Sequence, residues 1–337
     1  MAEAWRRVGL VVNPAAGKST SSTTGVQNAL RSLGVDVALT CQAGKAALSG
    51  WSGVVSVHAV EATGRSYTHA LVQWLSGQNV DAVVVVGGDG TLADVAMVCA
   101  EKQWRVPIIG IGTGSTNVGR LITCCADKAP ELDLRDLETW SPDSLTASFN
   151  GELVGLAFND IVIGHTVVGT IEDRPRDLNA AEHMRGQAIP GRPRCIGGPR
   201  TKVIRIGQEV ETLVAEGESV GTVVAGFAEP AFYGKAVTGG ICLAALAGLP
   251  AGCLICDMPL AQIEISATSL LHAAPISSRY VTLAEGISIT VENVREGAVL
   301  CMDGNPLRQL SESDRVAISV RRDAVVGVRS RRNLRWA

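Results

Sequence analysis

The residues best suited to chemistry lie in one short segment, Gly87 to Thr91, with the sequence Gly-Gly-Asp-Gly-Thr. Four consecutive valines, Val83 to Val86, precede it and are typical of a strand buried on both faces of a parallel sheet. From Leu92 the apolar residues recur at helical spacing. The glycines let the backbone bend sharply and approach a ligand, and the unpaired N–H groups of the helix start would face that ligand. The segment therefore predicts a phosphate site.

Asp89 is the carboxylate of this segment. Beside a bound phosphate, a carboxylate is costly unless it takes a proton or holds a cation. Asp89 is therefore predicted to be the catalytic residue, either as a general base or as a carboxylate linked to magnesium. The structural alternative is that Asp89 only caps the helix, although a cap needs one polar residue and no frame of three glycines.

Two further turns follow apolar strands in the same part of the chain. The first contains Asn13 and the run Gly17-Lys18-Ser19, which is similar to the end of a P-loop, but the motif fails because Val12 occupies the position of its first glycine. A plain turn is an equally good interpretation there. The second turn, from Gly110 to Gly119, lacks the glycine spacing of a dinucleotide fingerprint. Over all three turns, the predicted nucleotide and phosphate contacts are Asn13, Gly17, Lys18, Gly87, Gly88, Gly90, Thr91, Gly112, Thr113, Gly114, Ser115 and Asn117.

Strands and helices in alternation must hold these turns at one edge of a sheet. The predicted strands cover residues 8–12, 35–40, 54–60, 83–86 and 106–111, and the predicted helices cover 27–33, 67–75 and a segment from 92. The 67–75 helix is predicted to present one face made of Tyr67, Ala70, Leu71 and Trp74. Because ligands bind at the carboxyl ends of strands in such sheets, residues 1–141 are predicted to form a doubly wound α/β nucleotide-binding domain.

From residue 142 the sequence changes to short β-branched segments separated by glycine. Residues 144–150 and 152–158 suggest a hairpin around Asn150-Gly151. Further strands are predicted at 162–170, 201–206, 222–225, 262–265, 280–283, 286–291, 299–301 and 315–320. Residues 174–199, with five arginines and four prolines, break the pattern as a loop or as a short helix over 178–184 with flanking loops. We predict an antiparallel all-β domain over residues 142–321, which would bind the acceptor.

The motifs of the first third, taken together, resemble one superfamily. They are Asn13-Pro14 with Gly17, then Gly87-Gly88-Asp89-Gly90-Thr91, then Gly112-Thr113-Gly114 with Asn117. In this order they look like the ATP-NAD kinase family and its relatives, the diacylglycerol and sphingosine kinases. The resemblance implies a phosphotransferase with an alcohol group as acceptor, ATP and Mg²⁺ as cofactors, and a site in the interdomain cleft. It also implies that residues 322–337 pack back onto the first domain.

Two segments of the second domain bear on the acceptor. Asn159-Asp160 resembles the pair with which NAD kinases hold NAD, and an amide with a carboxylate can recognise an adenine amino group and ribose hydroxyls. A structural turn is the alternative. Met302-Asp303-Gly304 keeps the Asp-Gly of both branches, but the lipid kinases place a glutamate base where this chain has Asn305. That difference assigns the base role to Asp89 and points away from the lipid branch.

The resemblance to true NAD kinases is incomplete in the second domain. Phe232 to Gly240 keeps only fragments of the expected NAD kinase segment, and Thr170 to Gly198 is more like the divergent ATP-NAD-kinase-like proteins associated with acetoin catabolism. The hypothesis is an ATP-dependent small-molecule kinase that converts NAD to NADP, with Asn159 and Asp160 orienting the acceptor. The alternatives are a lipid or other alcohol kinase, and a nucleotide-binding regulator without catalysis.

Composition and charge limit the class of protein. A chain of 337 residues that is 46% hydrophobic can build two cores, and 19% charged residues do not indicate disorder. A net charge of −3 argues against nucleic acid as the main partner. The four arginines near the end are interpreted as a solvated basic tail; they are Arg329, Arg331, Arg332 and Arg335.

The expected location is the cytoplasm. We find no signal peptide and no apolar stretch long enough to span a bilayer, and the nine cysteines are interpreted as reduced core residues. Cys253 and Cys256 have the spacing of a metal or redox pair. The sequence has no second Cys-x-x-Cys and no His pair nearby, so no metal ligand is assigned among them. We expect no stable membrane association, and the sequence leaves a homo-oligomer open.

Overall fold

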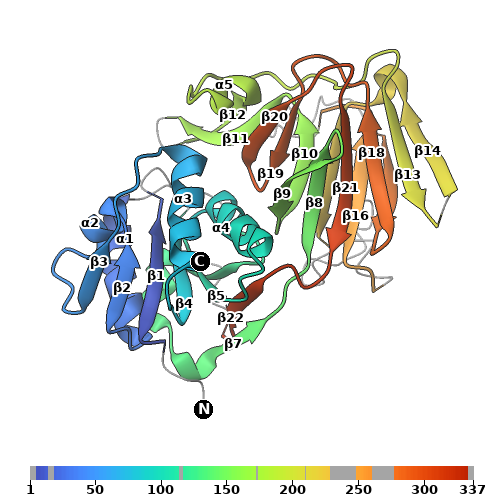
Figure 1. Cartoon of the computed structure of the whole chain (residues 1–337). Coiled ribbons are helices and arrows are strands. Elements are labelled where there is room, and N and C mark those ends of the chain that lie inside the picture. Colours follow the sequence, from blue (N-terminus) through green and yellow to red (C-terminus); the bar gives the residue numbers. More distant parts are fainter. Residues whose placement is uncertain are drawn as a thin grey trace. The chain divides into compact units, whose positions relative to one another are not determined.

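The computed structural model describes residues 5–13, 19–113, 117–171, 174–208, 210–227, 248–259 and 277–332 (Figure 1). The chain divides into two compact units, Met1–Asp143 with Asp323–Ala337 and Ser144–Arg322. In the described ranges, every helix is too short or too polar to cross a bilayer.

The first unit is built on a sheet in the order β3-β2-β1-β4-β5-β22-β7, with β6 also paired to β5. Its strands are β1 (Arg7–Val12), β2 (Val37–Thr40), β3 (Val54–Val57), β4 (Ala82–Gly87), β5 (Pro107–Gly112), β6 (Ile122–Cys125), β7 (Leu137–Trp140) and β22 (Val326–Ser330). Neighbours among β1 to β6 are parallel, and every residue of β4 is buried. The valine run thus forms the centre of the sheet, as predicted.

Helices cover both faces of this sheet. They are α1 (Ser19–Ser32), α2 (Gln42–Ala47), α3 (Gly64–Ser76) and α4 (Asp89–Glu101). The 3₁₀ turns η1 (Ala126–Glu131) and η2 (Leu134–Asp136) lie between β6 and β7. Leu30 of α1 packs with Leu10 and Val84 on one face. On the other face α3 lies close to Gly9, where a β-carbon would come within 2.9 Å of Leu75. The doubly wound α/β fold predicted for the first domain is confirmed.

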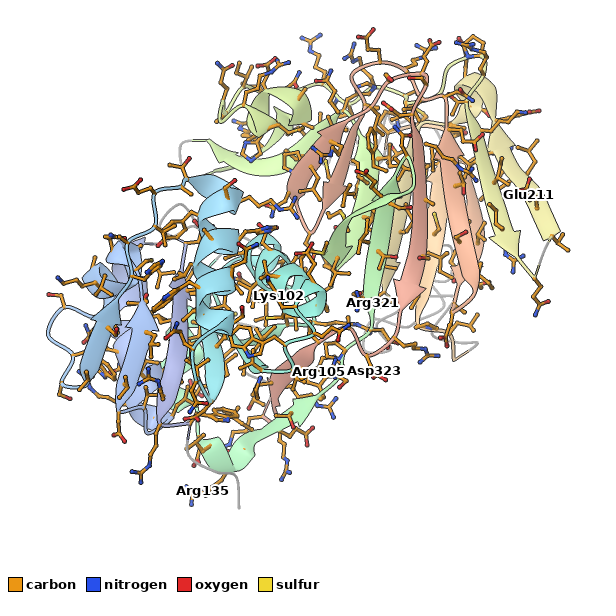
Figure 2. All side chains as sticks on the ribbon, viewed as in Figure 1. Lys102, Arg105, Arg135, Glu211, Arg321 and Asp323 are labelled. Carbon is orange, nitrogen blue, oxygen red and sulfur yellow. The ribbon has the colours of Figure 1, made fainter. Side chains whose placement is uncertain are left out.

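The strand β22 joins the end of the chain to the first unit. It runs parallel to β5 and antiparallel to β7. Arg105, ahead of β5, fixes the start of this segment, because its guanidinium donates to the Asp323 carbonyl at 2.8 Å and to the Ser141 hydroxyl at 3.1 Å (Figure 2). Arg329 lies over the Trp140 ring and pairs with Glu138 at 2.6 Å.

The arginines that follow also find carboxylates. Arg331 pairs with Glu138 at 3.4 Å and Arg332 with Asp136 at 2.8 Å, while both side chains stay more than half exposed. Arg335 lies outside the described residues. These pairs are surface ion pairs, each of which contributes little to stability.

The second unit is a sandwich of two antiparallel sheets. One sheet has the order β17-β16-β15-β10-β19-β20 and the other β14-β13-β18-β21-β8-β9, while β11 and β12 form a separate hairpin. The strands of the first are β17 (Ser278–Leu283), β16 (Ala251–Cys256), β15 (Thr222–Phe227), β10 (Asp160–Gly164), β19 (Val299–Met302) and β20 (Asn305–Gln309). Those of the second are β14 (Val210–Glu216), β13 (Lys202–Gly207), β18 (Ile287–Glu292), β21 (Arg315–Arg321), β8 (Ser144–Phe149) and β9 (Glu152–Ala157). Ile161 and Val223 of one sheet share a core with Ile289 and Ile318 of the other, so the antiparallel fold predicted here is confirmed.

Several local predictions were right and others were wrong. Asn150 and Gly151 form the predicted hairpin turn, with φ of 50° and 90°. The strand predicted over 162–170 is instead two strands, because the chain turns at His165 between β10 and β11 (Thr166–Ile171). In 174–199 the structure shows β12 (Arg174–Asn179) followed by a short helix α5 (Ala180–Met184). The strand predicted at 262–265 lies outside the described residues.

The face predicted for the 67–75 helix is buried only at Leu71. Thr68, Leu71, Val72 and Leu75 are the buried residues of α3. Trp74 instead stacks its ring on His58, with ring centroids 4.5 Å apart. The large aromatic surface of Trp74 is thus covered by another ring.

Candidate phosphate-binding site

Three neighbouring parallel strands end together at one edge of the first unit. Val12 of β1 pairs with Val86 of β4, and Gly87 of β4 pairs with Gly112 of β5. The residues that directly follow these strands therefore lie side by side. They are Asn13, Gly88 and Thr113, all of which belong to the predicted set.

Hydrogen bonds join the three turns into one structure. The Asn13 side-chain amide donates to the Thr91 hydroxyl at 2.9 Å, and the Asn13 backbone N–H donates to the Val86 carbonyl at 3.0 Å. The Thr113 backbone N–H donates to the Gly87 carbonyl at 2.9 Å. Asn13 is thus held against the first turn of α4, a contact between residues 78 positions apart.

Glycine is required at two of the strand ends. A β-carbon on Gly87 would lie 2.7 Å from the β-carbon of Thr91, and one on Gly112 would lie 2.7 Å from Cγ of Asn117. The absence of both β-carbons lets the Thr91 and Asn117 side chains fold over the ends of β4 and β5. The glycine pattern therefore sets the close packing of the turns.

Asp89 is the first residue of α4, and its carboxylate binds the second glycine turn. Gly88 is the N-cap of the helix and no side chain caps it, so Asp89 does not cap its own helix. Its Oδ2 accepts the Val118 N–H at 3.1 Å and its Oδ1 accepts the Gly119 N–H at 2.9 Å. A β-carbon on Gly119 would lie 2.7 Å from Asp89 Oδ1, so this approach also needs glycine. Asp89 thereby ties the start of α4 to the turn after β5.

The Thr113 hydroxyl is the clearest sign of a ligand. Thr113 is 7% exposed, and its Oγ1 has no hydrogen-bond partner among the described residues. It lies where β5 ends, beside Gly87 and hence beside the start of α4. The first N–H groups of a 13-residue helix such as α4 have no intrahelical acceptor. The buried Thr113 hydroxyl and the N–H groups at the start of α4 could together donate hydrogen bonds to an anionic oxygen of a ligand.

Part of the predicted set lies outside the described residues, namely Gly17, Lys18, Gly114 and Ser115. Gly88, Gly90 and Thr91 open helix α4, and Asn117 begins the turn that Asp89 holds, with φ of 51°. The described members thus come together at one edge of the sheet.

A partly buried ion pair that the sequence analysis did not single out fixes α4 against α3. The Asp94 carboxylate, only 9% exposed, accepts the Arg65 Nε–H at 2.6 Å, and Nε2 of His69 lies 3.8 Å from the same oxygen. Arg65 and His69 are four residues apart and so share one face of α3. That spacing, opposite an acidic residue in the next helix, was the signal available in the sequence.

Asn159 and Asp160 lie in the second unit, where β9 passes into β10. Both are half-buried. Their backbone N–H groups donate to the Asp303 carboxylate at 2.8 and 3.0 Å. The sequence analysis treated Asp303 only as part of a motif, and the structure shows it in contact with the predicted acceptor pair.

The cysteine pair of β16 is buried. Cys253 and Cys256 are both free thiols, and burial raises their pKa to about 12 and about 11. Over the described ranges, no three His, Cys, Asp or Glu residues are grouped in a way that would hold a metal ion.

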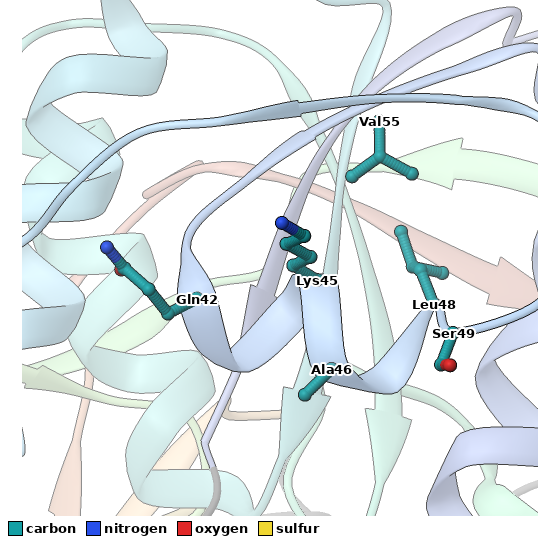
Figure 3. Close-up of a pocket in the computed structure, with 6 residues that line it drawn as sticks. All are labelled: Gln42, Lys45, Ala46, Leu48, Ser49 and Val55. Atoms are coloured by element: carbon teal, nitrogen blue, oxygen red, sulfur yellow. The ribbon is translucent and has the colours of Figure 1, made fainter.

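A cavity of about 450 Å³ opens beside α2 and β3 (Figure 3). Its lining residues are Gln42, Lys45, Ala46, Leu48, Ser49 and Val55. None of them belongs to the predicted site.

The comparisons with known proteins agree with these motifs. Residues 8–118 match the family model described as the ATP-NAD kinase N-terminal domain. A protein of Archaeoglobus fulgidus described only as "Uncharacterized protein" is 30% identical over 248 residues, which are 73% of this chain and 74% of that protein.

Two solved structures show the fold. Yeast NADH kinase complexed with NADH has a TM-score of 0.52 at 12% identity, covering 99% of this chain and 86% of that chain. A proposed diacylglycerol kinase from Bacillus anthracis has a TM-score of 0.51 at 15% identity, covering 96% and 97%.

Proposed function

Because the chain belongs to the NAD kinase/diacylglycerol kinase-like superfamily, we propose that it is an ATP-dependent kinase that phosphorylates a hydroxyl group of NAD or a related small acceptor. In this reaction the acceptor oxygen forms a bond to the γ-phosphorus of ATP, and the bond from that phosphorus to the β–γ bridging oxygen breaks. With NAD the products are NADP and ADP. The buried Thr113 hydroxyl, unpartnered among the described residues beside the start of α4, is the observation that carries the proposal.

The start of α4 is the proposed phosphate-binding element. Gly90 lies in the first turn of α4, where its N–H cannot reach a carbonyl of the same helix. With the Thr113 hydroxyl it offers donors to phosphate oxygens. Asn13 holds Thr91 and so keeps the first turn of α4 in place. Gly17, Lys18, Gly114 and Ser115 complete the proposed nucleotide contacts.

The residues present fit a magnesium ion. Asp89 Oδ1 and Oδ2 each accept a backbone N–H, and a carboxylate oxygen has a second lone pair that can bind a cation. Mg²⁺ in kinase sites is commonly held by one or two carboxylates together with the substrate phosphates. Asp89 would hold it, and the ion would supply positive charge to the phosphates of the donor.

In the alternative to the magnesium role, Asp89 is the proposed proton acceptor. The N–H groups of Val118 and Gly119 fix the direction of its carboxylate. Phosphoryl transfer depends mainly on the positioning of the reacting groups and on the charges around them. A carboxylate base held in one orientation contributes to both. The proton of the acceptor hydroxyl passes to Asp89 as the new bond to phosphorus forms. General base catalysis contributes about 10²–10⁴-fold to the rate.

Asn159 and Asp160 are the proposed acceptor contacts. An amide can both donate and accept hydrogen bonds, and a carboxylate accepts from two vicinal hydroxyls, which suits an adenine ring and a ribose. Asn305, in place of a glutamate, cannot take a proton near neutral pH, which favours a nucleotide over a lipid acceptor.

An acceptor panel tests the proposal. Purified protein with ATP and Mg²⁺ is offered NAD, NADH, sphingosine and diacylglycerol, and transfer of labelled γ-phosphate is scored. We expect label on NAD or NADH. Labelled lipid with no labelled nucleotide would show that the acceptor is a lipid and not NAD. ATP binding with transfer to none of the four compounds would indicate a regulator without catalysis.

A further inference from the structure

Asp303 lies in a tight turn of the second unit, between β19 and β20. Met302 pairs with Asn305, so Asp303 and Gly304 form a two-residue hairpin turn with φ of 48° and 78°. Positive φ at both central residues is typical of this kind of turn, in which Asp-Gly is a preferred sequence. Asp303 is nevertheless only 7% exposed, which is unusual for a charged residue at a hairpin turn.

The carboxylate of Asp303 is buried because it binds another segment. Oδ2 accepts the Phe158 N–H at 2.7 Å, and Oδ1 accepts the N–H groups of Asn159 at 2.8 Å and Asp160 at 3.0 Å. In return the Asp303 N–H donates to the Asp160 carbonyl at 3.0 Å. Hydrogen bonds to an ionised carboxylate are stronger than those between neutral groups. Three successive backbone N–H groups are therefore held at one point.

These contacts are made by the backbone N–H groups of the segment. The Asn159 carbonyl also accepts the Phe227 N–H at 3.4 Å, which ties the segment to the end of β15. Asn159 and Asp160 are themselves half-buried beside this fixed backbone. The direction of their side chains is set by the backbone conformation that Asp303 imposes.

We propose that Asp303 is a positioning residue that holds the backbone of residues 158–160 so that Asn159 and Asp160 meet the acceptor. The inference rests on the proposed function for the role of those two side chains. Asp303 is not the base in this scheme, a role that is proposed for Asp89. Its carboxylate binds the three N–H groups and lies almost out of solvent. The Asp-Gly motif of the second unit thus acts on acceptor binding and not on the chemical step.

The substitution Asp303→Asn tests this assignment. An asparagine offers one oxygen and one NH₂ group, so in either orientation an NH₂ faces at least one of the three N–H donors. The matched control is Asp314→Asn in the same unit. The Asp314 carboxylate accepts the Ser311 N–H and hydroxyl at 2.8 Å each and the Asn150 amide at 2.9 Å, and none of these partners is a residue of the proposed site.

Two measurements are made on both variants. In Asp303→Asn, the KM for NAD should rise by up to about 100-fold, since small displacements of positioning groups have effects of that size. The KM for ATP and kcat should stay near their wild-type values. Amide hydrogen exchange of residues 158–160 should become faster. Asp314→Asn should speed exchange near residue 311 and leave the KM for NAD unchanged.

The outcomes separate the inference from the proposed function. A fall in kcat at unchanged KM for NAD would make Asp303 part of the chemistry and overturn the positioning role, as would unchanged exchange at residues 158–160. Should the wild-type protein phosphorylate no acceptor of the panel, the proposed function fails. NAD affinity by calorimetry then replaces KM, and an unchanged affinity in Asp303→Asn would overturn the inference by itself.

Discussion

Replacing Thr113 with valine removes a single hydroxyl and keeps the shape of the side chain. Thr113 Oγ1 is buried and has no hydrogen-bond partner among the described residues. An unmade hydrogen bond at a buried hydroxyl costs about 1–3 kcal/mol. The substitution Thr113→Val should therefore leave the free energy of unfolding unchanged or raise it slightly, in contrast to most changes at buried sites.

The effect on activity should have the opposite sign. A hydrogen bond to a charged group contributes about 1.5–3 kcal/mol. Since 1.36 kcal/mol corresponds to a factor of ten, loss of a bond from Thr113 to a phosphate oxygen should lower kcat/KM for ATP by about 10- to 100-fold.

Thr290 provides a matched control. Thr290, in β18 of the second unit, is fully buried, and its Oγ1 likewise lacks a hydrogen-bond partner among the described residues. Thr290→Val makes the same chemical change at a site with no proposed ligand. Urea unfolding monitored by circular dichroism, and initial rates at varied ATP concentration, are measured for both variants.

Two results would refute this reasoning. If Thr113→Val were destabilised by more than about 1 kcal/mol, the hydroxyl would have a partner within the protein. If kcat/KM for ATP fell equally in Thr113→Val and Thr290→Val, the loss would come from replacing any buried threonine with valine. The Thr113 hydroxyl would then not contact the nucleotide.

Further predictions concern Asp89, Gly119 and the buried thiols. Asp89→Asn should lower kcat by about 10²–10⁴-fold with little change in the KM for ATP, and near-normal turnover would exclude the base role. Gly119→Ala places a β-carbon 2.7 Å from Asp89 Oδ1 and would displace that carboxylate, so kcat should fall by up to about 100-fold. The control is Gly77→Ala, whose β-carbon meets only a carbonyl oxygen at 3.5 Å; its kcat should be close to that of the wild type. Burial raises the pKa of Cys253, and likewise of Cys99 and Cys124, from 9.0 to about 12. As pH rises, the unfolded chain loses these protons before the folded chain does. The contribution of the thiols to the free energy of unfolding is therefore fully present below pH 9 and is lost as pH rises towards 12. Urea unfolding on either side of pH 9 checks this, and Cys253→Ala should show a shallower dependence; a free energy of unfolding that is flat above pH 9 would contradict it.

Local patterns in the sequence account for much of the fold. The valine run predicted β4 because four β-branched residues in a row suit a strand covered on both faces. The glycines that follow located the turn, and Asn150-Gly151 located a hairpin. In each case the determining residues are neighbours in the chain, so the pattern could be seen without a structure.

The strands that were missed lack such a pattern. β14 is an edge strand whose residues are mostly exposed, with glutamates among valine and leucine. β12 carries two arginines and a proline. These segments are strands because of their position in a sheet and not because apolar and polar residues alternate in them. That position depends on partner strands elsewhere in the chain.

The contacts of the candidate site could be predicted only in part. The residue types at Asp89, Thr113 and Asn159 were recognised from motifs. The partners of Asp89 are backbone N–H groups 29 and 30 residues away, and Asp303 reaches Asn159 across 144 residues. Every residue except proline has such an N–H, so residue type gives no signal for these bonds. That the residues of the two units act in one cleft stays a prediction of the sequence.

The place of β22 in the sheet has a consequence for how the chain matures. This strand lies between β5 and β7 in the sheet, yet in the chain it follows the whole of the second unit. On a ribosome, Pro107 and Ile108 at the start of β5 would lack the neighbour strand β22 until the residues of the second unit, Ser144–Arg322, have emerged. An exposed strand edge invites wrong pairing. Synthesis of this protein therefore contains a built-in delay, during which a chaperone or rapid folding of the second unit would protect the unfinished sheet.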